Sequence, residues 1–407
     1  MDRAMGSATN RQYLRLPCGA KEKNMTVSFL MPDMNGPVLG PVTVLARHLQ
    51  GAFDVQIVGP DLGHGVCPMY RGAFPYTVIP CPRLYRYPNY WWERGRLERA
   101  VTGDLIIPVK AVGDTIPLAL RLKKARGAAV VPYLDEWDGA LLARLSPLER
   151  FVRRIRHAHH PLEDVYYPRV ERLIPRCDSV ISTSRFLQRR FGGEIIPMGV
   201  DCEFFQPCSP EESRALKREL GLADKRLIVF GGVVRPHKGI ELIPRAVARA
   251  GLSDARFLIV GPVNEHVRAL QEDPELAPWI VTAGPQPRNQ MPRFLSLADL
   301  IVLPLQDTLL AQSQVPCKIY EAMAMARPIL ASDVSDMSEI LAGCGWVAPA
   351  GDVRALADTM GAIFADPAEA RRRGEAARAR CLAQYSSEIA RGLLIDLVNL
   401  VLKETRS

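Results

Sequence analysis

Long apolar runs are missing from this 407-residue sequence: no stretch reaches about 18 uninterrupted apolar residues, the length that a membrane-spanning helix needs. The first 24 residues are polar and mixed, without the apolar stretch of a signal peptide. The 9 cysteines are odd in number and include no Cys-x-x-Cys pair. These absences argue against a secreted, disulfide-bonded or membrane-spanning protein, and we expect free thiols in the reducing cytoplasm.

Positive charge is concentrated in one part of the chain. The net charge is +8, and residues 83–190 hold 21 Lys and Arg against 12 Asp and Glu, whereas the remainder is nearly neutral. A local excess of positive charge favours an anionic partner that binds at this part of the protein. The sequence has no stacking motif of a nucleic-acid-binding module, which argues against a nucleic-acid partner. LERFVRRIRHAHH, residues 148–160, mixes arginines with apolar side chains. It suits the anionic inner face of a cell membrane, and a solvated helix face is the alternative.

Two series of short β-branched runs alternate with helical segments, which predicts an α/β protein of two doubly wound domains. TVSFLMPD opens the first series and RLIVFGG the second, with the Pro-rich stretch IIPMGVDCEFFQPCSPEE between them. We expect a disordered extension at 1–24, an N-terminal domain at 25–205, a C-terminal domain at 206–385 and a final amphipathic helix at 386–407. Ligands of such sheets bind at the carboxyl ends of strands, so the loops after strands are where we look for a site.

The loop FGGVVRPHKGIELI, residues 230–243, follows the first strand of the second series. Gly232 allows a sharp turn and a close approach of the backbone. Arg235 and Lys238 stand at the mouth of the next helix, whose unpaired N–H groups and positive dipole end attract anions. A guanidinium and an ammonium at such a place suit a diphosphate. An ordinary glycine turn with two solvated cations is the alternative.

A second loop and helix, QDTLLAQSQVPCKIYEAMAMA, contain Glu321 among small and apolar neighbours. A carboxylate in these surroundings must face a cleft unless it is paired. It can accept two hydrogen bonds from the vicinal hydroxyls of a ribose. An ion pair with Lys318 on a solvated face is the alternative. Together, the two loops favour a nucleotide diphosphate bound between them.

These two stretches resemble the signature motifs of the retaining nucleotide-sugar glycosyltransferases of glycosyltransferase family 4, which have the GT-B fold. IIPMGVDCEFFQP and ISTSRFLQRRFG resemble the linker of that family and the segment before it. The resemblance begins near Met25 and is strongest over residues 179–349. It implies two facing Rossmann-like domains with an interdomain cleft. The C-terminal domain would bind the donor, the N-terminal domain would supply the acceptor, and the last helix would pack back on the N-terminal domain.

The resemblance also implies roles for individual residues. The two cations of the first loop would stabilise the departing diphosphate, and the helix glutamate would hold the ribose. Loop amides would bind phosphate oxygens, while a glycine-rich loop of the N-terminal domain would approach the diphosphate from the other side. The residues concerned are Arg235, Lys238, Glu321, Gln314, Val315, Gly36 and Gly40.

The sequence departs from the family pattern at two places. Ser313 stands eight positions before Glu321, where the family usually has a second glutamate that touches the donor sugar. We expect the serine to bind donor without charge, which leaves the sugar specificity open. The segment PYLDEWDGAL lacks the histidine that the family often has, and carries Asp135, Glu136 and Asp138 instead.

Three interpretations of that acidic cluster remain open. Asp135 could orient or deprotonate an acceptor hydroxyl, as a catalytic residue. Glu136 and Asp138 could hold a divalent cation. The cluster could also cap a helix and form its solvated first turn. We expect no metal and no cofactor, because the two loop cations already neutralise the leaving group.

The resulting prediction is a retaining hexosyltransferase. It would move a sugar from a nucleoside diphosphate sugar to a hydroxyl acceptor, and a lipid-linked acceptor is one candidate. The expected setting is bacterial polysaccharide or glycoconjugate biosynthesis in the cytoplasm, at the periphery of the membrane. The alternatives are glycosylation of a small natural product and a non-catalytic nucleotide-sugar-binding protein, which the serine at 313 would suit.

Overall fold

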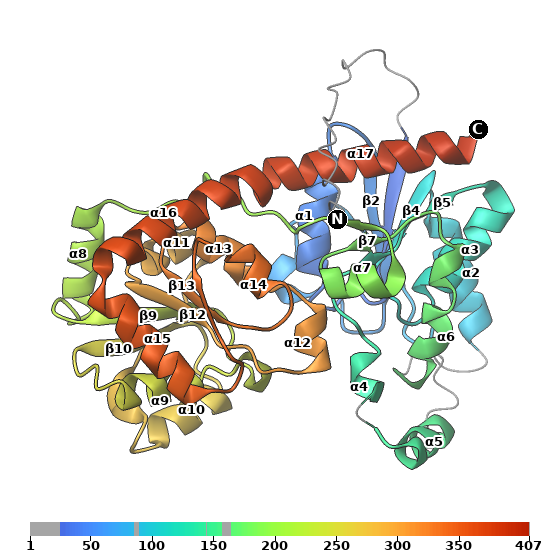
Figure 1. The fold of residues 1–407 in the computed structure, drawn as a ribbon. Coiled ribbons are helices and arrows are strands. Elements are labelled where there is room, and N and C mark those ends of the chain that lie inside the picture. Colours follow the sequence, from blue (N-terminus) through green and yellow to red (C-terminus); the bar gives the residue numbers. More distant parts are fainter. Residues whose placement is uncertain (1–24, 85–88, 144, 157–163, 407) are drawn as a thin grey trace, which may run out of the picture.

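The computed structural model describes residues 25–84, 89–143, 145–156 and 164–406, which form two α/β domains side by side (Figure 1). The predicted extension at 1–24 and residues 157–163, which include the end of the basic segment, lie outside the described residues. Within the described ranges, no helix combines the length and the apolar character that crossing a membrane requires. The eight cysteines in those ranges are all free thiols.

The N-terminal domain is built on a parallel sheet with the strand order β3-β2-β1-β4-β5, continued by a small parallel sheet, β6-β7-β8. A bridge between Val109 and Tyr133 joins the two sheets. The strands are β1 (Thr26–Leu30), β2 (Asp54–Asp61), β3 (Tyr76–Pro80), β4 (Leu105–Pro108), β5 (Ala129–Val130), β6 (Tyr133–Leu134), β7 (Ile181–Ser182) and β8 (Glu194–Ile195). The helices are α1 (Leu39–Leu49), α2 (Tyr90–Ala100), α3 (Thr115–Arg126), α4 (Ala140–Ala143), α5 (Pro147–Arg156), α6 (Tyr167–Glu171) and α7 (Arg185–Phe191), with 3₁₀ turns η1 (Pro68–Tyr70), η2 (Asp164–Tyr166) and η3 (Ile174–Arg176).

The C-terminal domain has one six-stranded parallel sheet of order β11-β10-β9-β12-β13-β14. Its strands are β9 (Arg226–Gly231), β10 (Ala255–Val260), β11 (Ile280–Gly284), β12 (Leu300–Leu303), β13 (Ile329–Ser332) and β14 (Trp346–Ala348). Its helices are α8 (Pro210–Glu219), α9 (Leu242–Arg249), α10 (Glu265–Glu272), α11 (Met291–Leu295), α12 (Leu309–Ser313), α13 (Lys318–Ala324), α14 (Met337–Ile340), α15 (Val353–Ala365) and α16 (Pro367–Gln384), with 3₁₀ turns η4 (Pro236–Lys238), η5 (Ala277–Trp279) and η6 (Arg288–Gln290).

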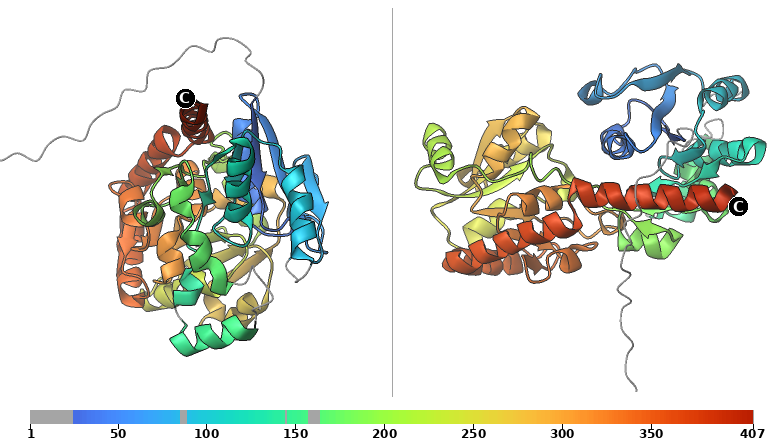
Figure 2. Two further views of the ribbon diagram at one scale, coloured as in Figure 1. Left: turned by 90° about the vertical axis from the view of Figure 1, so that its right-hand side faces the viewer. Right: turned by 90° about the horizontal axis from the view of Figure 1, so that it is seen from above.

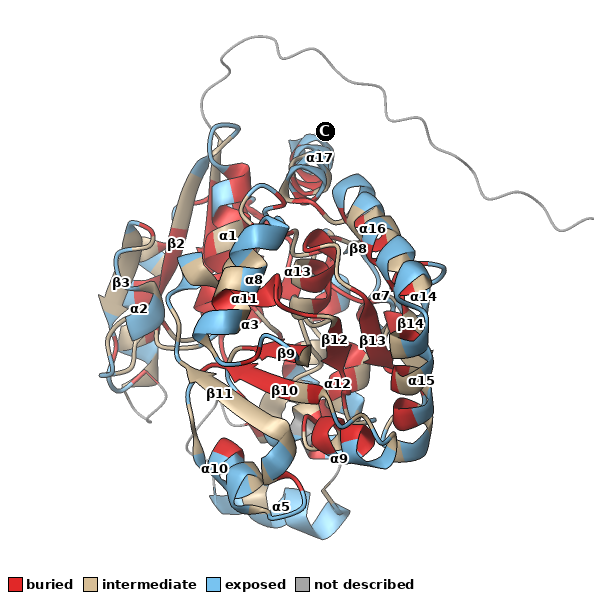
Figure 3. Cartoon of the chain, turned by 90° about the vertical axis from the view of Figure 1, so that its left-hand side faces the viewer, coloured by how far each residue is buried: buried red, intermediate tan, exposed pale blue. Residues whose placement is uncertain are grey.

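Both sheets are sandwiched between helices, and their central strands are buried on both faces (Figure 3). This is why those strands read as continuous apolar runs such as LIVF and LIVL instead of alternating patterns. Parallel sheets covered by helices confirm the predicted α/β class and its two doubly wound domains. In the C-terminal sheet the strand order reverses between β9 and β12, so the loops after these two strands meet at a topological switch point.

The chain crosses between the domains twice. Val200 and Ser386, one from each crossing, pair as a parallel β-bridge. The final helix α17 (Ser387–Arg406) then runs from the C-terminal domain across to the N-terminal one, as the view from above in Figure 2 shows. There Leu394 and Val398 join the core of the N-terminal sheet and pack with α1. Phe205, before the first helix of the C-terminal domain, belongs to the core of that domain.

Candidate active site

A cavity of about 350 Å³ opens between the loop after β9 and the loop after β12. Both loops follow neighbouring strands at the switch point, where ligands of open α/β sheets bind. The predicted residues Arg235, Lys238, Gln314 and Glu321 all line it. The other lining residues are Phe230, Leu303, Pro304, Leu305, Pro316, Cys317 and Lys318.

The loop after β9 is shaped by glycines. Gly239 has a left-handed backbone, with φ of +61°, and a Cβ there would overlap the carbonyl oxygen of Pro304. Glycine therefore lets this loop close against the loop after β12. Arg235 is exposed and extended just before η4, and α9 begins only at Leu242. Lys238 consequently ends a 3₁₀ turn that precedes the helix and Arg235 stands just before that turn, so neither cation is at the first residue of the helix.

Lys238 is the more enclosed of the two predicted cations. Its Nζ donates a hydrogen bond to the carbonyl oxygen of Val233 at 3.1 Å and lies 5.6 Å from the centre of the Phe230 ring. Burial and, to a smaller extent, the positive charges of Lys318 and Arg235 lower the pKa of Lys238 to about 8, against the opposing charge of Glu321. An anion in the cavity would reverse this shift, because it would favour the charged ammonium.

Glu321 and Lys318 lie one turn apart on α13, and both side chains remain about 30% exposed toward the cavity. Their charged atoms are 3.9 Å apart, which is too long for a good hydrogen bond. The two sequence interpretations are therefore both realised: the glutamate has an ionic neighbour and also faces the cavity. Its oxygens keep the hydrogen-bonding capacity that a ribose would use.

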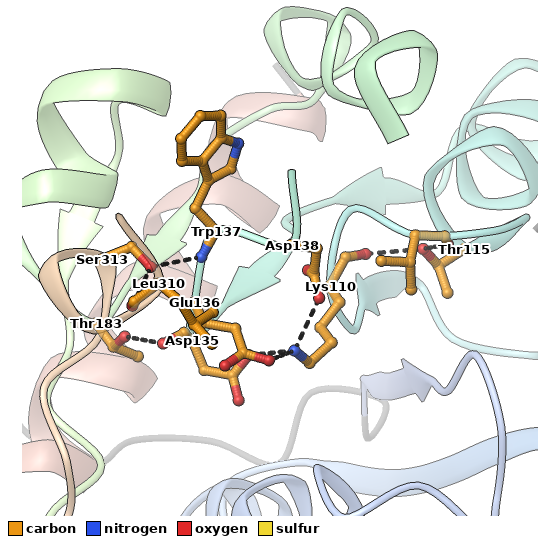
Figure 4. Close-up of polar contacts among 10 residues, drawn as sticks. Lys110, Thr115, Asp135, Glu136, Trp137, Asp138, Thr183, Leu310 and Ser313 are labelled. Carbon is orange, nitrogen blue, oxygen red and sulfur yellow. Dashed lines mark hydrogen bonds and ion pairs between the residues drawn. The ribbon is translucent and has the colours of Figure 1, made fainter. Parts of the chain in front are cut away.

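Ser313 lies away from the cavity, at the seam between the domains (Figure 4). It is fully buried, and its hydroxyl accepts a hydrogen bond from the backbone N–H of Trp137 at 2.9 Å while donating one to the carbonyl of Leu310 at 2.8 Å. The Ser184 hydroxyl donates to the Ser313 carbonyl at 2.7 Å. Both sides of this residue are thus occupied by contacts within the protein.

The acidic cluster after β6 surrounds a lysine that follows β4 (Figure 4). Lys110 Nζ lies 3.0 Å from Asp138 Oδ1 and 3.4 Å from Asp135 Oδ1, and it donates a short hydrogen bond to Glu136. Burial lowers the pKa of Lys110, but the three carboxylates outweigh burial and raise that pKa above its ordinary value. Burial raises the pKa of Asp135, and it raises the pKa of Asp138 to about 6, in both cases against the charge of Lys110.

This arrangement bears on the three interpretations of the cluster. The ammonium occupies the centre where a divalent cation would sit, and among the described residues no group of His, Cys, Asp or Glu is arranged to hold a metal ion. Lys110 itself has a left-handed backbone, with φ of +65°, and its carbonyl accepts a hydrogen bond from the Thr115 hydroxyl at 2.8 Å. The lysine is therefore held in place by its backbone as well as by its charge.

The remaining predicted residues lie outside the described lining of the cavity. Gly40 is in α1, where a Cβ would overlap the ring of Tyr70, so packing explains this glycine. Gly36 precedes α1 and packs near the Asp33 carbonyl. Val315 is partly buried against the core of the C-terminal domain. Gly232 has φ of +118° and lies beside the end of the Lys318 side chain.

The sequence interpretation did not predict the roles of three residues at the cavity and the domain seam: Lys110, Trp137 and Lys318. Lys110 directly follows the strand run LIIPV, so the rule that ligands gather after parallel strands could have found it. The sequence interpretation gives Lys318 a place only as a possible ion-pair partner of Glu321. Trp137 carries no sequence signal for its role, because its backbone N–H, and not its side chain, makes the contact with the other domain.

Residues 224–366 match the family model of the glycosyl transferases group 1. Over 360 residues, 81% of this chain and 94% of the relative, the sequence is 27% identical to a GDP-mannose-dependent α-(1-6)-phosphatidylinositol monomannoside mannosyltransferase of Mycolicibacterium smegmatis. It is 29% identical over 211 residues to an α-maltose-1-phosphate synthase of Mycobacterium tuberculosis. This second match spans only about half the length of either protein.

Solved structures share the whole fold. The crystal structure of Anabaena HepE in complex with UDP superposes with a TM-score of 0.73 and covers 92% of this chain and all of that one, at 16% identity. At this identity the likeness concerns the fold, and it identifies the two facing Rossmann-like domains as those of GT-B proteins. The predicted fold is therefore confirmed.

Proposed function

We propose that this chain, which has the GT-B fold and matches the glycosyl transferases group 1 over residues 224–366, moves a hexose from a nucleoside diphosphate sugar to a hydroxyl acceptor with retention of configuration. The observation that carries this proposal is the convergence of Arg235, Lys238 and Glu321 on one cavity at the switch point of the C-terminal sheet. Two cations beside a carboxylate match a diphosphate that is attached to a ribose.

The cations act on the leaving group. Negative charge builds on the diphosphate as the bond to the sugar breaks. Arg235 and Lys238 therefore bind the diphosphate more strongly in the transition state than in the ground state. We favour attack of the acceptor on the same face of the sugar, with the leaving phosphate taking the acceptor proton. This course needs neither a metal nor a cofactor, since the protein supplies the positive charge itself.

We assign the acceptor to the N-terminal domain, with Asp135 as the residue that orients its hydroxyl. Burial raises the pKa of Asp135, which brings this carboxyl closer to the range in which it can exchange a proton near neutral pH. The mycobacterial relative is named for a glycolipid acceptor, and this supports a lipid-linked acceptor here. The setting we propose is bacterial glycolipid or polysaccharide biosynthesis.

Binding of the donor is tested first by thermal shift with a panel of nucleoside diphosphates and their sugars. A nucleotide that binds only the folded protein raises the melting temperature in proportion to occupancy. Incubation with the best donor alone should then release nucleoside diphosphate slowly, because water can replace the acceptor. Binding without any release would favour the non-catalytic alternative, and no shift with any nucleotide would overturn the proposal.

We also propose that α5 holds the enzyme on an anionic membrane. Its apolar side chains Leu148, Phe151 and Ile155 are 59–70% exposed, and Arg150, Arg154 and Arg156 stand beside them. The helix projects from the edge of the N-terminal domain in Figure 1 and is mostly pale blue, that is exposed, in Figure 3. A cationic helix with a free apolar face suits the headgroup region of anionic lipids.

Flotation with vesicles tests the membrane proposal. Phosphatidylcholine vesicles that contain phosphatidylglycerol should carry the protein upward, and vesicles of phosphatidylcholine alone should not. The double variant Phe151→Asp/Ile155→Asp should stay at the bottom. Leu382→Asp changes a similarly exposed apolar residue of α16 in the C-terminal domain and should float like the unmodified protein. Equal flotation of all three proteins would remove the proposal.

A further inference from the structure

We propose that Lys318 is a third cation of the donor site and binds the diphosphate together with Arg235 and Lys238. This inference rests on the proposed function and extends it, because it adds a binding residue that determines the preference for a diphosphate. Lys318 is the first residue of α13, which follows α12 and a short loop, and it lines the same cavity as the other two cations.

The two lysines converge on one aromatic ring. Lys318 Nζ lies 5.9 Å from the centre of the Phe230 ring, and Lys238 Nζ lies 5.6 Å from it. Phe230 is in β9, immediately before the glycine turn. The ammonium groups therefore reach the end of this strand from opposite loops, one from η4 and the other from α13.

Gly232 has a conformation and an environment that fit this placement. Its φ of +118° is in the region that favours glycine, and a Cβ at this position would stand 2.8 Å from Lys318 Nζ and 3.0 Å from its Cε. The absent side chain thus leaves the space that the end of the lysine fills. We expected Gly232 to allow a close approach of the donor to the backbone. In the structure it gives space to the Lys318 side chain, which we propose binds the donor.

The charges of the cavity also need a dianion. Arg235, Lys238 and Lys318 face one carboxylate, Glu321, so two positive charges are left without a counter-charge in the lining. The diphosphate of a nucleotide sugar carries two negative charges. Grouping like charges is unfavourable unless an anion completes the set.

Pairing with Glu321 alone does not account for the lysine. The two charged atoms are 3.9 Å apart on partly exposed side chains, and an ion pair of this kind contributes little to stability. The repulsion between Lys318 and Lys238 works against it. A lysine whose role was only to stabilise the fold would be less costly on the outer face of α13, away from the other cations.

The variant Lys318→Met tests the inference by calorimetry with the best-binding nucleoside diphosphate, its monophosphate and its nucleoside. We expect the diphosphate to lose 10- to 100-fold in affinity, the monophosphate less, and the nucleoside little. Lys318→Arg should restore the preference for the diphosphate, and Lys318→Gln should behave like Met. Lys124→Met, on the distant helix α3, is the matched control and should bind as the unmodified protein does.

The outcomes separate the two proposals. If the unmodified protein binds no nucleotide, the proposed function fails. If it binds the diphosphate and Lys318→Met binds all three ligands with unchanged ratios, only the role of Lys318 fails. An equal loss for all three ligands would show that Lys318 acts solely by positioning Glu321 on the ribose. A further readout is pH: without the charge of Lys318, diphosphate affinity should start to fall at a higher pH, because Lys238 then keeps its proton longer beside Arg235 and Glu321.

Discussion

Replacing Lys238 by methionine is expected to stabilise the unliganded protein at pH 7 while it weakens nucleotide binding. The reason is the cost of holding this ammonium in a partly buried site beside Lys318 and Arg235. Burial and these charges lower the pKa of Lys238 from 10.5 to about 8. At pH 7 the lysine is charged in both the folded and the unfolded protein, so the folded state bears the full cost of the charge.

The size of the effect follows from the same pKa. A change from 10.5 to about 8 corresponds to about 3 kcal/mol. The partial exposure of the side chain reduces this amount, and the lost hydrogen bond to the Val233 carbonyl costs about 1 kcal/mol. A net gain of about 1–2 kcal/mol in the free energy of unfolding remains for Lys238→Met at pH 7.

The pH dependence of the stability difference gives this prediction a second test. As pH rises from 8 to 10, Lys238 loses its proton in the folded protein first, so the cost disappears and the advantage of the variant should shrink. Urea unfolding at pH 7 and pH 10 measures both values. Lys124→Met, which changes an exposed lysine, should alter the free energy of unfolding by less than about 0.5 kcal/mol at either pH. A destabilised Lys238→Met at pH 7, or a gain that persists at pH 10, would refute the reasoning.

Three further predictions concern catalysis, pH and the seam. Arg235→Ala and Lys238→Ala should each lower turnover about 10²–10³-fold and donor affinity much less, and steady-state kinetics that show near-normal rates would contradict the leaving-group role. The affinity of the unmodified protein for a nucleoside diphosphate should be constant below pH 8 and fall up to about tenfold per pH unit above it, as Lys238 deprotonates in the free protein; calorimetry across pH 7–9.5 measures this. Ser313→Ala should lower the free energy of unfolding by about 1–3 kcal/mol in urea unfolding, because the partly buried N–H of Trp137 loses its acceptor. Ser253→Ala, at an exposed loop serine, is the control and should leave the free energy of unfolding nearly unchanged.

The architecture could be predicted because its signals are local. Apolar runs such as LIVF and LIVL are long enough, and the helices between them regular enough, to define parallel sheets without any knowledge of contacts. The cavity could be predicted for a related reason. Arg235, Lys238 and Glu321 lie in loops that follow neighbouring strands, and the topology of such sheets brings these loops together.

Residues whose roles depend on distant partners could not be predicted in the same way. The resemblance implies a place near the diphosphate for Gly40, but it gives no hint of the ring of Tyr70, 30 positions later, which a Cβ at Gly40 would overlap. The acidic segment after β6 gives no hint that Lys110 stands at its centre, because the two come from different strands. A sequence shows which groups are charged or small, whereas burial and partners decide which of them remain available to a ligand.

The contacts of Ser313 explain what a serine does at the position where the resemblance leads us to expect a glutamate. A glutamate at this position would have to place its carboxylate either at the seam, where the Trp137 N–H and the Leu310 carbonyl already share the hydroxyl, or out in the cleft. The serine instead fastens α12 to the N-terminal domain, and beside it Arg185 at the start of α7 binds Asp336 through its N–H and Glu339 through its guanidinium. In this chain the position thus makes a contact between the domains and carries no charge. In the proposed enzyme, recognition of the donor sugar would then depend on residues other than Ser313.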